Sequence, residues 1–170
     1  LPNGVIVHYY LKKFDSKKDK VELQFKSNDG ELIKTYSSDD KKNKLNIKEG
    51  GNSFVWDTRY DGAEKLEGMI FWSASFSGAK AVPGSYSVSL LINGEEKVQK
   101  FDILADPRSE SSVKDMQKQF DFVNEVNQTV DIAHKAIKKI RTIAMKLTDF
   151  IKQNESDSTA TKLVDQAKEI

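Results

Sequence analysis

In several short segments between residue 1 and about residue 105, apolar and polar residues alternate with a period of two. A strand with one face in a core and the other in water has this period, because successive side chains point to opposite faces. The pattern therefore predicts antiparallel strands that each have one wet face. The alternating segments are residues 5–11, 21–25, 45–47, 54–56, 86–92 and 101–103.

Turn residues separate these segments at the spacing of a β-sandwich. Asn93-Gly94 stands between two strand-like segments, and because both residue types tolerate positive φ the pair predicts a tight hairpin. Asn28-Asp29-Gly30 predicts a second hairpin, and Pro83-Gly84 predicts a turn before the 86–92 segment. We expect an Ig-like β-sandwich of about seven or eight short antiparallel strands over residues 1–106.

The period changes to that of a helix after Asp106-Pro107-Arg108. Ser112-Val113-Lys114-Asp115 has the pattern of a helix N-cap, and neither Gly nor Pro follows Pro107. Steps of three or four between apolar residues predict an amphipathic helix over residues 112–152. The apolar stripe consists of Val113, Met116, Phe120, Val123, Val126, Val130, Ala133, Ile137, Ile140, Ala144, Leu147 and Ile151.

A shorter second helix is predicted to begin near Asp157, after a polar turn at residues 153–156. Its apolar face would contain Ala160, Leu163, Val164 and Ala167. The chain is then α+β, with the sandwich over residues 1–106 and a helical hairpin over residues 107–170. The irregular step from Val123 to Val126 leaves open whether the long helix is continuous near residues 123–130.

The long helix exceeds what the rest of the chain can cover. It would measure about 60 Å at ~1.5 Å per residue, whereas the second helix would measure only about 20 Å, and the sandwich about 35 Å. Part of the stripe is therefore expected to meet a second copy, a continuation of the polypeptide or another protein. The residues expected to pack against such a partner are Val113, Met116, Phe120, Val130, Ile137, Ile140, Leu147 and Ile151.

Composition argues against several classes of function. The 27 basic and 26 acidic residues nearly cancel, so the basic excess typical of nucleic-acid binding is missing. The chain contains no cysteine, which removes disulfides and thiolate sites. Its apolar stretches are far shorter than the roughly 20 residues that span a bilayer. Leu1 is not an initiator methionine, so we expect the chain to be a fragment of a longer protein.

Candidate catalytic and metal-binding residues are scarce. His8 and His134 are the only histidines, and neither has a second ligand or an oriented partner at a suitable spacing, so both are interpreted as surface or boundary residues. Asn28-Asp29-Gly30 and Ser38-Asp39-Asp40 are interpreted as turns, because no calcium-loop series follows. No nucleophile or phosphate-binding motif occurs. We expect no enzymatic activity, no cofactor and no metal.

Two aromatic segments are the strongest candidates for ligand binding. Trp56 is interpreted as a core residue, with Asp57 and Arg59 bonded to neighbouring turns; the alternative is a binding edge. Residues 69–76 are apolar on both faces, which favours a strand covered on both sides. The alternative is an aromatic platform for sugar stacking. The residues of such a carbohydrate-binding surface would be Tyr60, Trp72 and Phe76.

Four ordered motifs within residues 1–125 carry a resemblance to a known protein region. They are Leu-Pro-Asn-Gly-Val-Ile-Val-His-Tyr-Tyr-Leu-Lys at residues 1–12, Gly-Asn-Ser-Phe-Val-Trp-Asp-Thr-Arg-Tyr at 51–60, Val-Pro-Gly-Ser-Tyr-Ser-Val at 82–88 and Asp-Pro-Arg at 106–108. Together they resemble the region that follows the propeller in bacterial sortilin-type or sialidase-like (BNR-repeat) β-propeller proteins. The resemblance implies an extracytoplasmic accessory domain that contributes no catalytic residue.

These observations predict a non-catalytic accessory or assembly module of a larger β-propeller protein. Its expected partners are the missing propeller of the same polypeptide, a second copy bound through the helices, or both; nucleic acid and a membrane span are not expected. The alternative is a carbohydrate-binding β-sandwich, and a third interpretation is an inert spacer.

Overall fold

The computed structural model describes residues 3–70, 75–153 and 162. The elements in chain order are β1 (Val5–Leu11), β2 (Val21–Ser27), β3 (Leu32–Ser37), β4 (Gly50–Trp56), β5 (Gly84–Ile92), β6 (Glu95–Ile103) and α1 (Val113–Gln153). The chain divides into two compact units. The first contains Leu1–Gly62 and Ser77–Val126, and the second contains Ala63–Phe76 and Asn127–Ile170.

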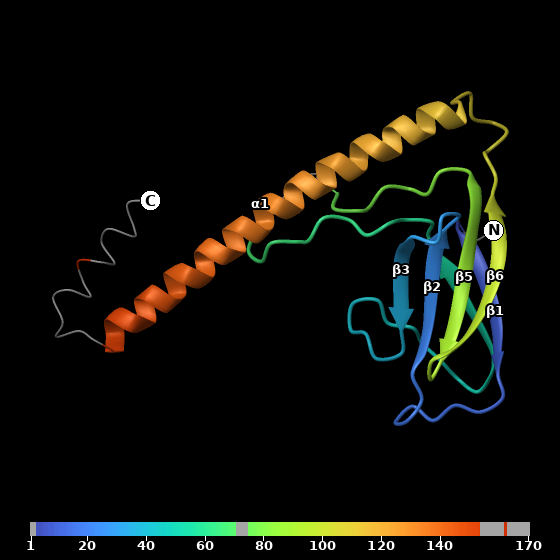
Figure 1. Ribbon diagram of the computed structural model, residues 1–170, viewed down its shortest axis with the longest axis horizontal. Helices are drawn as coiled ribbons and strands as arrows, with labels where there is room; N and C mark the ends of the chain where they lie inside the picture. The colour runs from blue at the N-terminus through green and yellow to red at the C-terminus, as the bar shows by residue number, and fades with distance from the viewer. Residues whose placement is uncertain (1–2, 71–74, 154–161, 163–170) are drawn as a thin grey trace. The chain divides into compact units, whose positions relative to one another are not determined.

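The strands of the first unit form two antiparallel sheets (Figure 1). β1 pairs with β4, and the larger sheet has the order β3-β2-β5-β6. With the C-terminal helix these sheets make the chain an α+β protein, as the sequence predicts. The described residues contain six strands, rather than the seven or eight expected.

Both predicted hairpin turns are present. Asn93 and Gly94 have φ values of 52° and 94° and join β5 to β6, with Ile92 paired directly to Glu95. Positive φ at both central residues matches the right-handed twist of the flanking strands, which explains the Asn-Gly pair. Gly30, with φ of 83°, lies in the turn that joins β2 to β3.

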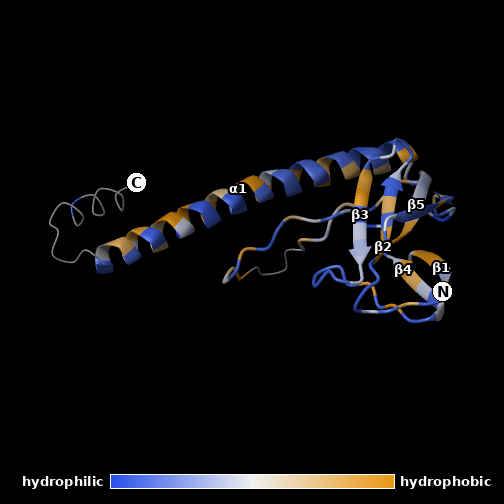
Figure 2. Cartoon of the chain, turned by 60° about the horizontal axis from the view of Figure 1, so that its bottom comes forward, coloured by the Kyte–Doolittle hydropathy of each residue, from blue (hydrophilic) through white to orange (hydrophobic). Residues whose placement is uncertain are grey.

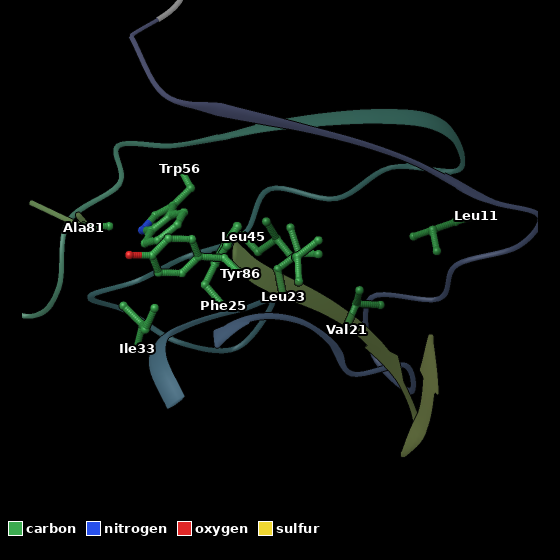
Figure 3. Close-up of a cluster of buried hydrophobic side chains, with 10 residues drawn as sticks. Leu11, Val21, Leu23, Phe25, Ile33, Leu45, Trp56, Ala81 and Tyr86 are labelled. Carbon is green, nitrogen blue, oxygen red and sulfur yellow. The ribbon is translucent and has the colours of Figure 1, made fainter. Parts of the chain in front are cut away.

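Inward-facing residues of the two sheets build one core. Val21, Leu23 and Phe25 of β2 are fully buried, in agreement with their period-two spacing. Phe25 stacks on Trp56 of β4 with a ring-centroid distance of 4.5 Å, which joins the larger sheet to the smaller one. Figure 3 shows Trp56, Phe25 and Tyr86 close together beside the aliphatic side chains.

One predicted strand, at residues 45–47, is wrong. Residues 45–47 form no strand; a single bridge joins Lys44 to Ser37, and Leu45 enters the core from an irregular segment. This segment is short and follows a run of charged residues, which disfavours sheet pairing. Of the predicted strand at residues 69–76, the described residues 69–70 and 75–76 lie outside any strand, and residues 71–74 lie outside the described residues.

Helix α1 begins and continues as the sequence predicts. The Ser112 hydroxyl accepts the backbone N–H of Asp115 and donates to its carboxylate, so the N-cap is formed. The helix is continuous through residues 123–130. The predicted second helix, from about Asp157, falls almost entirely outside the described residues. No helix in the described part of the chain is both long and apolar enough to cross a membrane.

Two partly buried tyrosines of the first unit are expected to make the folded state less stable at alkaline pH. Burial raises the pKa of Tyr36 to about 12, with a smaller contribution from Asp57 and Asp61. Burial also raises the pKa of Tyr60 to about 12, whereas an unfolded chain ionises tyrosine near pH ~10. The protonated folded form is therefore favoured below pH ~10, and this stabilisation is lost as the pH rises from ~10 to ~12.

We expect the midpoint of thermal unfolding to fall over this pH range, and to fall less in the Tyr36→Phe/Tyr60→Phe double variant. Circular dichroism at a series of pH values measures the midpoint, and absorbance at the tyrosinate band follows ionisation directly. An equal loss in the parent and the double variant would show that these two phenols do not carry the effect.

Candidate interaction surface

In the second unit, residues 63–67 lie along one face of α1. The backbone N–H of Glu64 donates to the Asp131 carboxylate at 2.6 Å, and Nδ1 of His134 donates to the carbonyl oxygen of Glu64. One turn further on, Lys138 pairs with the Glu64 carboxylate. Residues three or four apart lie on one helix face, so this segment covers a single polar face of α1.

The same face continues to Arg141, whose guanidinium donates to the carbonyl oxygen of Glu67 at 3.1 Å. Ala63 and Leu66, between these polar contacts, are both 6% exposed. The hydrogen bond from Lys138 lowers the pKa of the Glu64 carboxyl group. We call the helix face that contains Asp131, His134, Lys138 and Arg141 the covered face.

His134 corrects a prediction from the sequence. It is 3% exposed and bonded to the Glu64 carbonyl oxygen, with its ring centroid 5.9 Å from that of Phe76. It is therefore a buried structural residue rather than a surface or boundary histidine. His8 is exposed on β1, as expected. Over the described ranges, no group of three His, Cys, Asp or Glu residues could hold a metal ion.

The predicted stripe on α1 is unevenly covered. Val113 and Ile140 are exposed, and the side chain of Ile151 lies outside the described residues. Phe120 makes an edge-to-face contact with Tyr60, with ring centroids 4.7 Å apart. The other residues that were expected to pack against a partner are partly buried. They are Met116, Phe120, Val130, Ile137 and Leu147.

A second apolar row follows the helix beside the predicted stripe. Its members are separated by steps of three, four, three and four, which is the spacing of a coiled-coil contact. Ile140 is 65% exposed and Ile143 is 48% exposed. At about 100° per residue this row lies roughly opposite the covered face. We call this row the seam; it contains Ala133, Ala136, Ile140, Ile143 and Leu147.

Sequence reasoning missed the true centre of this apolar surface. The predicted stripe runs between the covered face and the seam. Val130 and Ile137 are therefore half-buried, while Ile140 lies on the seam. Ile132 and Ile143, 71% and 48% exposed, were not in the stripe. Figure 2 shows the hydrophobic residues of α1 interrupted by hydrophilic ones along its length. Following the three-four spacing backwards from Leu147 through Ile143 and Ile140 would have identified the seam.

The three residues proposed for carbohydrate binding lie in different parts of the chain. Tyr60 belongs to the first unit, where its ring contacts Phe120. Phe76 belongs to the second unit and contacts His134. Trp72 lies outside the described residues.

The residues around Trp56 have the structural roles that the sequence predicts. Trp56 is fully buried, and its Nε1 donates to the Arg59 carbonyl oxygen at 3.2 Å. The Asp57 carboxylate accepts the backbone N–H of Arg59. The Arg59 guanidinium donates to the carbonyl oxygen of Gly78 at 2.9 Å. Both charged residues therefore make bonds that hold turns.

A shallow hollow of about 840 Å³ lies at one end of the β1–β4 sheet. Its lining includes the exposed Tyr10 ring together with His8, Asn46, Lys48 and Ser53. No carboxylate is among the described residues that line it. The described lining therefore supplies no pair of carboxyl groups of the kind used in glycoside cleavage.

Comparisons of the chain with protein-family models, curated proteins and solved structures find no match.

Proposed function

We propose that this chain is a non-catalytic accessory and assembly module of a larger protein, and that the seam on α1 is its contact surface. In this proposal the two sheets form an Ig-like sandwich that carries the helix. The motif resemblance supports an extracytoplasmic location beside a β-propeller of the same polypeptide. The proposal concerns packing between protein surfaces and assigns no chemistry to the chain.

The exposure of the seam is the observation on which the proposal depends. The protein's own segment at residues 63–67 bonds to the polar, covered face of α1 through Glu64 and Glu67. The large apolar side chains of Ile140 and Ile143 remain 65% and 48% exposed. Burial of a side chain of this size contributes about 1.5–3 kcal/mol. Two such residues within an apolar row at coiled-coil spacing therefore make the seam a favourable surface for a second helix.

Site-specific photo-cross-linking in cells that produce the protein tests the proposal. A benzophenone amino acid at Ile140 is expected to give a cross-linked product, because a bound partner lies within reach of the seam. The matched control is Met145, which is 61% exposed but lies off the seam. The same probe there is expected to give little product.

An aspartate on the seam provides a second readout. With the benzophenone probe at Ile143, Ile140→Asp is expected to abolish the product, since an uncompensated carboxylate in an apolar contact is strongly unfavourable. Met145→Asp introduces the same charge into the same helix and should leave the yield unchanged. Equal yields from Ile140 and Met145, or no product from either position, would contradict the proposed function.

A further inference from the structure

We propose that the partner of the seam is an acidic amphipathic helix, whose carboxylates pair with two lysines, Lys139 and Lys146, along one side of the seam. This inference rests on the proposed function and specifies the chemistry of the partner. It depends on how charge is distributed along α1.

The helix is strongly basic where it carries the seam. Residues 132–148 contain no acidic residue but contain the basic residues Lys135, Lys138, Lys139, Arg141 and Lys146. This local excess does not show in the whole chain, where 27 basic residues are balanced by 26 acidic ones. The basic residues are therefore concentrated on the stretch of α1 that contains the seam.

Two of these residues contact the protein's own chain on the covered face. Lys138 pairs with the Glu64 carboxylate, and Arg141 donates to the Glu67 carbonyl oxygen. Lys139 and Lys146 are exposed, and neither has an ion-pair partner within the described residues. These two lysines are seven residues apart, and each is followed directly by a seam residue. They occupy the flanking positions that form ion pairs between helices in coiled coils.

The opposite flank of the seam has no charge. The corresponding positions are Val130, Ile137 and Ala144, and the first two are partly buried. The surface thus consists of an apolar row with lysines on one side only. An approaching helix complements it with apolar residues at coiled-coil spacing and Glu or Asp on the side that meets Lys139 and Lys146.

A second copy of this chain is a poorer fit. It would bring its own Lys139 and Lys146 but no acidic residue from residues 132–148, so no carboxylate would meet the lysines and like charges would oppose association. An anionic membrane surface is also disfavoured. Helices that lie on membranes usually have a broad apolar face with basic residues over the polar face, whereas this seam is narrow and charged along one flank.

Binding of synthetic amphipathic peptides to the whole chain tests the inference. Three peptides of about four heptads share apolar seam residues and differ only at the flanking positions, which are Glu, Gln or Lys. Fluorescence anisotropy is expected to show the Glu peptide binding at least about tenfold more tightly than the Lys peptide, with the Gln peptide between them. The preference should decrease between about 0.05 M and 0.5 M NaCl, because salt screens exposed ion pairs.

Charge reversal at the lysines assigns the effect to this flank. Lys139→Glu/Lys146→Glu is expected to reverse the order of the Glu and Lys peptides. Lys12→Glu/Lys13→Glu changes the net charge equally at exposed positions of the first unit and should leave the order unchanged. Circular dichroism establishes that both double variants keep the helix content of the parent.

The outcomes separate this inference from the proposed function. Equal affinity for the three peptides, lost in Ile140→Asp, would overturn the acidic partner and leave the seam as a contact surface. No binding of any peptide, together with no cross-link at Ile140, would overturn both proposals. Sedimentation showing self-association through the seam would identify a second copy instead. Binding only to vesicles that contain phosphatidylglycerol would identify a membrane surface, and either result overturns the acidic helix.

Discussion

Replacing Trp56 by alanine is expected to lower the free energy of unfolding by about 3–5 kcal/mol. The side chain is fully buried between the sheets, where it stacks on Phe25 and makes edge contacts with Tyr86 and Phe101. Its Nε1 also donates to the Arg59 carbonyl oxygen. Alanine removes the ring, leaves a cavity that the surrounding strands fill only in part, and deprives that carbonyl group of its donor.

Urea unfolding followed by far-ultraviolet circular dichroism measures this loss, since the signal does not depend on the removed indole. Tyr10→Ala is a suitable comparison, because Tyr10 is an aromatic residue of the paired strand β1 that is 72% exposed. It should change the free energy of unfolding by no more than about 0.5 kcal/mol. A loss below about 1 kcal/mol for Trp56→Ala would mean that the two sheets do not depend on this stack.

The strands that the sequence predicts correctly are those specified by local pattern. Val21, Leu23 and Phe25 alternate with polar residues and are all fully buried on one side of β2. The Asn93-Gly94 turn is equally local, because positive φ at two consecutive residues restricts the residue types. Leu45 shows the limit of this reasoning. It is as well buried as the strand residues, yet it reaches the core from an irregular segment.

The existence of α1 was predictable, but the segment that covers its polar face was not. Spacing and the Ser112 cap predict a helix, and α1 begins at Val113. The covered face is defined by backbone groups of Glu64 and Glu67, which bond to Asp131, His134 and Arg141 across about 70 residues of chain. Backbone groups have no side-chain signature. No sequence pattern therefore indicated that residues 63–67 would cover this face or that His134 would be buried, whereas the apolar spacing through Ile140 and Ile143 does indicate the seam.

Gly78→Ala is expected to destabilise the first unit by about 2–3 kcal/mol. Gly78 is buried, and a Cβ atom at this position would lie 2.0 Å from the carbonyl oxygen of Tyr60 and 2.7 Å from that of Asp61. These are backbone atoms, so no side-chain rotation relieves the overlap. The two chain segments must separate instead. That movement weakens the hydrogen bond from the Tyr60 N–H to the Ala79 carbonyl oxygen and the one from Arg59 to Gly78.

Gly51→Ala is the matched control for this close approach. Gly51 lies in β4, has no positive φ, and has no atom within 4 Å of an added Cβ. The change should therefore alter the midpoint of thermal unfolding by little, and a small increase is expected because alanine restricts the unfolded chain. If both alanine variants unfold at the temperature of the parent, the backbone segments around Tyr60 and Gly78 are far enough apart to accept a Cβ atom. If Gly78→Ala alone unfolds early, this backbone contact is a required part of the first unit, and it adjoins the buried Trp56 motif through Arg59.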